Sequence, residues 1–135
     1  MSRSGSRAVA TLLFLALASS CATAQAKTVS YKNIRSPSGL IQCYAVVGHD
    51  DIQCLAPYLP DIGEFDTYFG LRPRGRTILA QRSDFPGYSS PVRTLRYGDT
   101  WKRPGIGCTM RTSGLTCRNR DGHGFHIQKG HVRRF

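Results

Sequence analysis

The sequence predicts a small all-β domain, an antiparallel sandwich or partly open barrel that is held together by disulfides. Short runs of apolar and polar residues are separated by Gly, Pro, Asn, Asp and Ser, and no segment sustains an apolar repeat of helical period. Four cysteines also occur in two similar arrangements, Ile-x-Cys at each end of residues 41–54 and apolar-x-Cys at each end of residues 106–117. These two observations favour paired short strands over helices.

The first 26 residues have the layout of a secretory signal peptide. A basic start is followed by an apolar run over residues 8–20, too short to span a bilayer easily, and then by small-residue patterns ending at Ala24 and Ala26. We favour cleavage after Ala26, with Ala24 as the alternative, over a buried N-terminal helix. Removal of 26 of the 135 residues leaves residues 27–135, which we expect to form one monomeric domain without a transmembrane span.

A lipoprotein anchor at Cys21 is the competing interpretation of the leader. A lipidated cysteine would follow an aliphatic residue three positions earlier, but Ala18 stands there and Leu17 is one place too far away. We therefore favour ordinary cleavage, which places the mature protein in the periplasm or outside the cell. Cleavage also removes Cys21 and leaves four cysteines, and an even number in an exported chain indicates two disulfides.

The strands follow one another between turn residues. Residues 65–71 alternate apolar and polar side chains, Gly75 precedes the next run in a turn, and residues 83–91 have the composition of a loop. Residues 92–98 are predicted to be a strand or an extended segment. The other predicted strands are residues 28–34, 40–47, 51–55, 76–81, 106–111, 115–120, 124–128 and 131–135.

The first cysteine pair fits a hairpin whose midpoint falls between Gly48 and His49, a plausible two-residue turn in which Gly supplies a positive φ. Cys43 and Cys54 would then lie opposite each other, close to disulfide range. Because side chains alternate along a strand, the Ile two positions before each cysteine shares its face and points to the same core.

A second hairpin, centred between Thr112 and Ser113, places Cys108 opposite Cys117 in the same way. The simplest connectivity is therefore Cys43–Cys54 and Cys108–Cys117, although bridges between the two hairpins remain an alternative. Zinc binding and free thiols are disfavoured, because the paired cysteines are eleven and nine positions apart and zinc sites use closer pairs.

Positive charge is concentrated in the second half of the chain. The sequence has 19 Lys and Arg residues against eight acids, and 14 of these cations with three of the acids fall in residues 71–135. Such a charge distribution fits an anionic partner, an envelope polymer, a lipid headgroup or nucleic acid, and it equally fits a solvated basic surface without a defined ligand. The residues predicted to contact the anion are Arg72, Arg74, Arg76, Arg118, Arg120, Arg133 and Arg134.

No strong catalytic motif is present. A metal site among His123, His126 and His131 is disfavoured by the surrounding positive charge, and no cofactor is expected. A ribonuclease-like hydrolase could pair His123 with Glu64, the only Glu of the chain, for acid–base chemistry. We favour a structural role for His123, between two glycines that need unusual φ angles, and turn chemistry for Ser38.

Six aromatic residues could stack on a ligand, but strand spacing favours the core for them. They are Tyr44, Tyr68, Phe69, Tyr97, Trp101 and Phe125.

Three motifs give the chain a resemblance to a bacterial family of exported proteins classed as a domain of unknown function. They are Ser36-Pro37-Ser38-Gly39 with Ile41 and Cys43, Gly114-Leu115-Thr116-Cys117 with Asn119, and Gly122-His123-Gly124-Phe125, and the chain closes on Arg133-Arg134-Phe135. The resemblance implies export and a shared fold but no activity. Relatives often carry a further cysteine pair near residues 60–82, which is missing here.

The sequence as a whole favours a nonenzymatic exported module that binds an anion or has a structural role. A small basic hydrolase, ribonuclease-like or acting on the cell wall, is the alternative. A lysozyme inhibitor is disfavoured, because lysozymes are mostly basic and would meet a chain of like charge.

Overall fold

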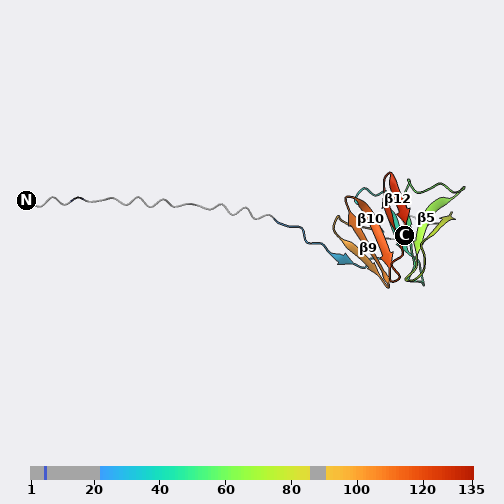
Figure 1. The fold of residues 1–135 in the computed structure, drawn as a ribbon, viewed down its shortest axis with the longest axis horizontal. Coiled ribbons are helices and arrows are strands. Elements are labelled where there is room, and N and C mark those ends of the chain that lie inside the picture. The colour runs from blue at the N-terminus through green and yellow to red at the C-terminus, as the bar shows by residue number, and fades with distance from the viewer. Residues whose placement is uncertain (1–4, 6–21, 86–90) are drawn as a thin grey trace, which may run out of the picture.

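The structure is a computed structural model that describes residue 5 and residues 22–85 and 91–135 (Figure 1). Most of the predicted signal peptide therefore lies outside the described residues, and so do residues 86–90 of the predicted loop over residues 83–91. Residues 22–26 have no regular secondary structure and are exposed. No helix in the described part of the chain is long and apolar enough to cross a membrane.

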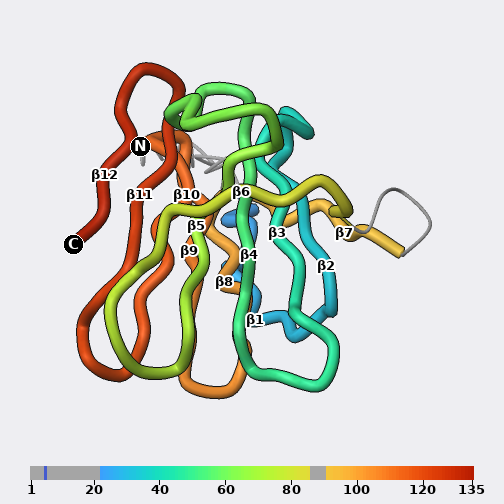
Figure 2. The backbone as a smooth tube through the Cα atoms, turned by 90° about the vertical axis from the view of Figure 1, so that its right-hand side faces the viewer, coloured from blue at the N-terminus to red at the C-terminus, as the bar shows by residue number. Residues whose placement is uncertain are grey.

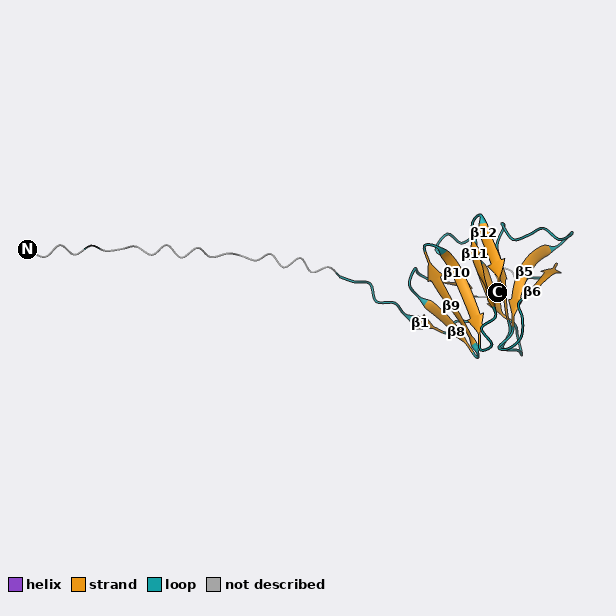
Figure 3. Cartoon of the chain, in the orientation of Figure 1, coloured by secondary structure: helices purple, strands orange, loops and turns teal. Residues whose placement is uncertain are grey.

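Two six-stranded sheets pack as a sandwich, which confirms the predicted all-β class (Figures 1 and 3). Sheet A has the order β1-β8-β9-β10-β11-β12 and sheet B the order β6-β5-β4-β3-β2-β7. The sheets do not close into a barrel. The strands are β1 Thr28–Val29, β2 Asn33–Arg35, β3 Gln42–Ala45, β4 Ile52–Leu55, β5 Asp66–Leu71, β6 Ile78–Arg82, β7 Arg93–Thr94, β8 Thr100–Arg103, β9 Ile106–Arg111, β10 Gly114–Asn119, β11 Gly124–Gln128 and β12 His131–Arg134.

The core lies between the two sheets and is built from the inward residues of each strand. Trp101 and Phe125 of sheet A are fully buried, and the Phe125 ring lies 5.2 Å from the ring of Phe69 in sheet B, centroid to centroid. Because side chains alternate along a strand, the residues between these inward positions point to the outer face of their sheet. This alternation decides which side chains are available for a ligand.

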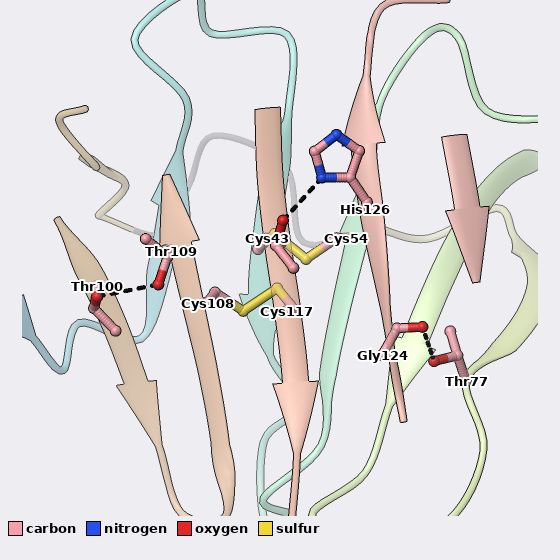
Figure 4. The surroundings of a disulfide bond; sticks show 10 residues. Cys43, Cys54, Thr77, Thr100, Cys108, Thr109, Cys117, Gly124 and His126 are labelled. Atoms are coloured by element: carbon pink, nitrogen blue, oxygen red, sulfur yellow. Dashed lines mark hydrogen bonds between the residues drawn. A yellow bond between two sulfur atoms is a disulfide. The ribbon is translucent and has the colours of Figure 1, made fainter. Parts of the chain in front are cut away.

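Both disulfides lie in this core. Cys43 is joined to Cys54 and Cys108 to Cys117, the pairs expected from the hairpin registers, and all four cysteines are fully buried (Figure 4). In each case the two cysteines are directly opposite in an antiparallel ladder. Each hairpin therefore contributes one cross-link to the interior of the sandwich.

The first hairpin turn differs in detail from its prediction. The two strands pair in the predicted register, with Cys43 opposite Cys54. The last hydrogen bond between them before the turn runs from the Val46 N–H to the Asp51 carbonyl oxygen. Within the turn, the His49 N–H donates to the Val46 carbonyl oxygen over 3.2 Å. The loop is therefore four residues long, residues 47–50, and contains a β-turn over residues 46–49, whereas the prediction had a two-residue Gly48-His49 loop. Gly48 has φ 77° at the third turn position, where a type II turn needs a positive φ.

The predicted strand over residues 28–34 is wrong as a single element, because it divides between the sheets. β1 pairs in parallel with β8 of sheet A, and β2 pairs in parallel with β7 of sheet B. The crossing segment is fixed by Trp101, whose Nε1 donates to the Tyr31 carbonyl oxygen over 2.6 Å. Strand β8 was not predicted, and residues 92–98 contain only the two-residue β7.

Candidate anion-binding surface

The strands of one sheet carry more positive charge than those of the other. The six strands of sheet A carry six Lys and Arg residues and no Asp or Glu, whereas the strands of sheet B carry three Arg and one Asp. The six cations of sheet A are Lys102, Arg103, Arg111, Arg118, Arg133 and Arg134. Sheet A can therefore present an anion with a surface free of acidic strand residues.

A row of polar side chains crosses the outer face of sheet A. Strand registers place six residues directly opposite one another in turn, Thr28, Thr100, Thr109, Thr116, His126 and Arg133. Their neighbours along the strands, such as Trp101, Cys108 and Cys117, are buried, so the row faces outward. We call these six residues the hydroxyl row, because four of them carry hydroxyl groups.

Hydrogen bonds within the hydroxyl row hold its side chains in place. The Oγ1 atoms of Thr100 and Thr109 lie 3.2 Å apart, and the Thr116 Oγ1 lies 2.8 Å from the His126 Nδ1 (Figure 4). Each hydroxyl has one proton and two lone pairs, so it keeps hydrogen-bonding capacity after one such contact. The row therefore offers ordered donors and acceptors to a polar ligand.

A second row lies beside the first and combines cations with glycines. Registers place Lys102, Gly107, Arg118 and Gly124 in line, and Gly124 exchanges backbone hydrogen bonds with Phe135 over 2.9 and 3.0 Å. A Cβ at residue 124 would collide with the Cys117 carbonyl oxygen, so only Gly fits there. Gly107 separates the two long cationic side chains, and Gly124 lies on the other side of Arg118.

Phe135 brings two of the predicted arginines together. The guanidinium carbon of Arg118 lies 4.5 Å from the centre of the Phe135 ring, and that of Arg133 lies 5.1 Å from it. Such contacts hold a guanidinium over an aromatic ring without neutralising its charge. Both arginines are exposed on the outer face of sheet A and remain available to an anion.

The seven predicted arginines divide into two groups. Arg72 forms an ion pair with Asp51 over 3.4 Å, and Arg74 forms one with Asp121 over 2.9 Å. The other five have no carboxylate partner among the described side chains, and they are Arg76, Arg118, Arg120, Arg133 and Arg134. These five arginines are the better candidates for anion contact.

A cleft of about 770 Å³ opens where the edges of the two sheets face each other. The edge strand β12 lies across from β5 and β6 at this side of the sandwich (Figure 2). The cleft has an apolar floor that includes Phe69, Leu79 and Val132. Its polar lining comprises Arg76, Thr77, His123, Arg133 and Arg134, so the described residues that line it include no acidic side chain.

His123 and Glu64 do not line a common cavity. His123 lines the cleft, whereas Glu64 lines a separate pocket with Gly39 and Asp66. The His123 N–H donates to the Asn119 Oδ1 over 3.0 Å, which fixes the backbone of the turn. Gly122 has φ 81°, as the prediction requires, but Gly124 is needed for its close approach to β10 and not for a positive φ.

The remaining residues considered in the sequence analysis are two histidines, Ser38 and six aromatic residues. His126 and His131 rings lie 5.8 Å apart, and no three metal-ligating side chains converge among the described residues. The Ser38 Oγ lies 2.9 Å from the Ser36 Oγ and accepts from the Leu40 N–H, as turn chemistry requires. Five of the six aromatic residues are buried, and Tyr97, which is 53% exposed, is the exception.

Sequence reasoning missed the hydroxyl row and Lys102. Thr100 and Lys102 belong to β8, which is four residues long and carries no alternation strong enough to predict a strand. The repeated Thr-Cys pattern was a usable signal, because Cys108-Thr109 and Thr116-Cys117 place a threonine beside each buried cysteine of one hairpin. A threonine beside an inward cysteine must face outward.

The fold and this surface define a class of protein, a disulfide-bonded β-sandwich with one basic face. The chain belongs to a family of unknown function, DUF6636, which matches residues 60–135. This match confirms the resemblance to a family of unknown function, and it covers every strand from β5 to β12. Comparisons with curated proteins and with solved structures found no match.

Proposed function

We propose that the protein is an exported, nonenzymatic module that binds an anionic polymer of the cell envelope through the outer face of sheet A. The observation that carries the proposal is that four of the six sheet A cations, Lys102, Arg111, Arg118 and Arg133, alternate with buried residues and so face outward, while the strands of that sheet carry no acid. Arginine guanidinium groups bind carboxylates and phosphates through paired hydrogen bonds. An extended face with spaced cations suits a polymer better than a compact ion.

The hydroxyl row favours a polysaccharide that bears carboxylates. Its threonine hydroxyls can donate to and accept from sugar hydroxyls, while Arg118 and Arg133 on the same face can bind carboxylates. Export is supported by the leader-like first 26 residues and by two buried disulfides, which are typical of compartments that do not reduce them.

Binding of polygalacturonate to the disulfide-bonded protein tests the proposal. We expect binding that weakens as salt is raised, because salt screens charge contacts and competes with them. The double variant Arg118→Gln/Arg133→Gln should bind more weakly and with a shallower salt dependence. The matched control is Arg35→Gln/Arg93→Gln on sheet B, which removes the same charge and one cation–π contact, where the first variant removes two. An equal loss of affinity in both double variants would show that binding depends on net charge alone and not on the outer face of sheet A.

Two further variants test whether the hydroxyl row contacts the polymer. Thr109→Val and Thr116→Val remove a hydroxyl and preserve the side-chain shape, so affinity should fall while the salt dependence stays unchanged. Thr67→Val on β5 of sheet B is the control, since it makes the same change away from the proposed face. Undiminished binding by the Thr109 and Thr116 variants would favour polyphosphate, lipid headgroups or nucleic acid over a glycan.

The alternative function is a basic hydrolase, and the position of His123 in the cleft with Arg76, Arg133 and Arg134 is the observation that favours it. The cleft lining lacks Glu64, so the proposed acid–base pair is not supported by a shared cavity. Incubation of the protein with RNA tests this alternative. Cleavage that disappears in His123→Ala would favour the hydrolase over the binding module.

A further inference from the structure

The main-chain nitrogen of Lys27 is hydrogen-bonded to the buried carboxylate of Asp99. It donates to the Asp99 Oδ1 over 3.0 Å, and the Lys27 carbonyl oxygen accepts from the Thr100 N–H over 2.8 Å. Lys27 directly precedes β1, which pairs with β8 in sheet A. Residue 27 is therefore the first position at which the chain is held by hydrogen bonds to the sandwich among the described residues.

Asp99 needs a positive partner where it lies. The residue is only 5% exposed, and a buried carboxylate is costly unless it is paired and hydrogen-bonded. Its Oδ2 accepts from the N–H and the Nε of Arg96 over 3.3 and 3.4 Å, but the Arg96 side chain is 60% exposed, so water screens its charge. From β9, the Met110 N–H donates to the Asp99 main-chain carbonyl oxygen over 3.0 Å.

We infer that cleavage after Ala26 converts the Lys27 nitrogen into an α-ammonium that forms an ion pair with the buried Asp99 carboxylate. Cleavage after Ala24 would instead leave Gln25 and Ala26 ahead of Lys27, whose nitrogen would remain a neutral amide. The new ammonium carries a full charge and three protons at a position already within hydrogen-bond distance of Asp99. Removal of the leader therefore completes the charge pairing of the folded domain.

The pair makes stability depend on pH in a defined direction. Asp99 raises the pKa of the Lys27 α-ammonium in the folded protein above the ordinary α-amino value of about 7.7–8.0. A raised pKa gives stabilisation that is fully present below the ordinary value and is lost as pH rises through the folded value. The charged side chain that contacts Asp99 is Arg96, through its Nε. The side chains of Arg96 and Lys27 are present in both chains compared below, so their own charges cancel in the comparison.

Two experiments test the inference. The intact mass of the protein, exported with its own leader, should correspond to a chain beginning at Lys27, and a chain beginning at Gln25 would overturn the inference. Thermal unfolding is then compared between chains beginning at Lys27 and at Gln25. We expect the Lys27 chain to have a midpoint several degrees higher at about pH 6, and the difference to vanish near about pH 10.

The variant Asp99→Asn tests whether the Asp99 carboxylate is the partner of the Lys27 α-ammonium. In this background the two chains should unfold at the same temperature at both pH values, whatever the variant costs in overall stability. A pH-dependent difference that survives Asp99→Asn would remove Asp99 from the pair. Equal midpoints of the two wild-type chains at both pH values would overturn the inference as a whole.

Discussion

The Asn119 side-chain amide donates to the Arg72 carbonyl oxygen over 3.0 Å, although the two residues are 47 positions apart, Asn119 at the end of β10 in sheet A and Arg72 directly after β5 of sheet B. The same Nδ2 donates to the Gly75 carbonyl oxygen over 2.7 Å, and the Oδ1 accepts from the N–H groups of Asp121 and His123. One buried side chain thus satisfies four backbone groups and connects the β5–β6 turn to the β10–β11 turn.

Asn119→Ala should destabilise the domain by about 2–4 kcal/mol, because it leaves several partly buried backbone groups without partners. Chemical denaturation measures the change. Asn119→Asp is the informative companion, since it keeps the acceptors for Asp121 and His123 but loses the donors to Arg72 and Gly75. A loss below about 0.5 kcal/mol in Asn119→Ala would contradict this role.

Replacement of a cysteine pair by alanine should also destabilise the domain. Cys43→Ala/Cys54→Ala and Cys108→Ala/Cys117→Ala each open a loop of similar length, for which the chain-entropy model gives about 2.5–3 kcal/mol. The loss of buried sulfur from the core adds to this. Peptide mapping without reduction is the accompanying measurement, and a peptide linking Cys43 to Cys117 would contradict the two local bridges.

Acid should weaken the link between the sheets through Asp121. The N–H of Gly75, 2.8 Å from the Asp121 Oδ2, and the Arg74 guanidinium lower the pKa of this carboxyl against the opposing effect of burial. A lowered pKa gives stabilisation that is present above the ordinary value of about 3.9 and is lost as pH falls through the folded value. Asp121→Asn should therefore unfold with a shallower pH dependence below about pH 4, as circular dichroism can measure.

Two glycines of the second outer row should respond differently to alanine. Gly124→Ala places a Cβ against the Cys117 carbonyl oxygen of the neighbouring strand, so we expect a loss at or above the upper end of about 1–3 kcal/mol. At Gly107 the nearest atom to a new Cβ is the flexible end of Lys102, 3.5 Å away. Gly107→Ala should be nearly neutral in the same thermal unfolding assay, and equal effects would refute the close approach at residue 124.

Local pairing explains how much of the fold could be predicted. The cysteine hairpins join strands that are neighbours in the sequence, so residue spacing alone places Cys43 opposite Cys54 and Cys108 opposite Cys117. The parallel pairs β1–β8 and β2–β7 join segments about 60–70 positions apart through strands of two to four residues, too short to show a period. The division of residues 28–34 could not be foreseen for this reason.

The same difference separates the predicted from the unpredicted parts of the surface. The excess of arginine in the C-terminal half can be counted in the sequence, but the ion pairs that these arginines form cannot be predicted from it. Arg72 and Arg74 meet Asp51 and Asp121 only because separate turns come together in the folded chain. The hydroxyl row depends on the register of five strand pairs, so no single stretch of sequence contains it.

Because the sandwich stays open, β12 ends sheet A with a backbone edge that pairs with no further strand in the described part of the chain. Such an edge can recruit a strand from another molecule and begin a fibre. A second copy that docked its own β12 in this way would bring Arg133 and Arg134 of both molecules into close proximity, and mutual repulsion would oppose the contact. We therefore expect the arginines at this edge to oppose edge-to-edge self-assembly.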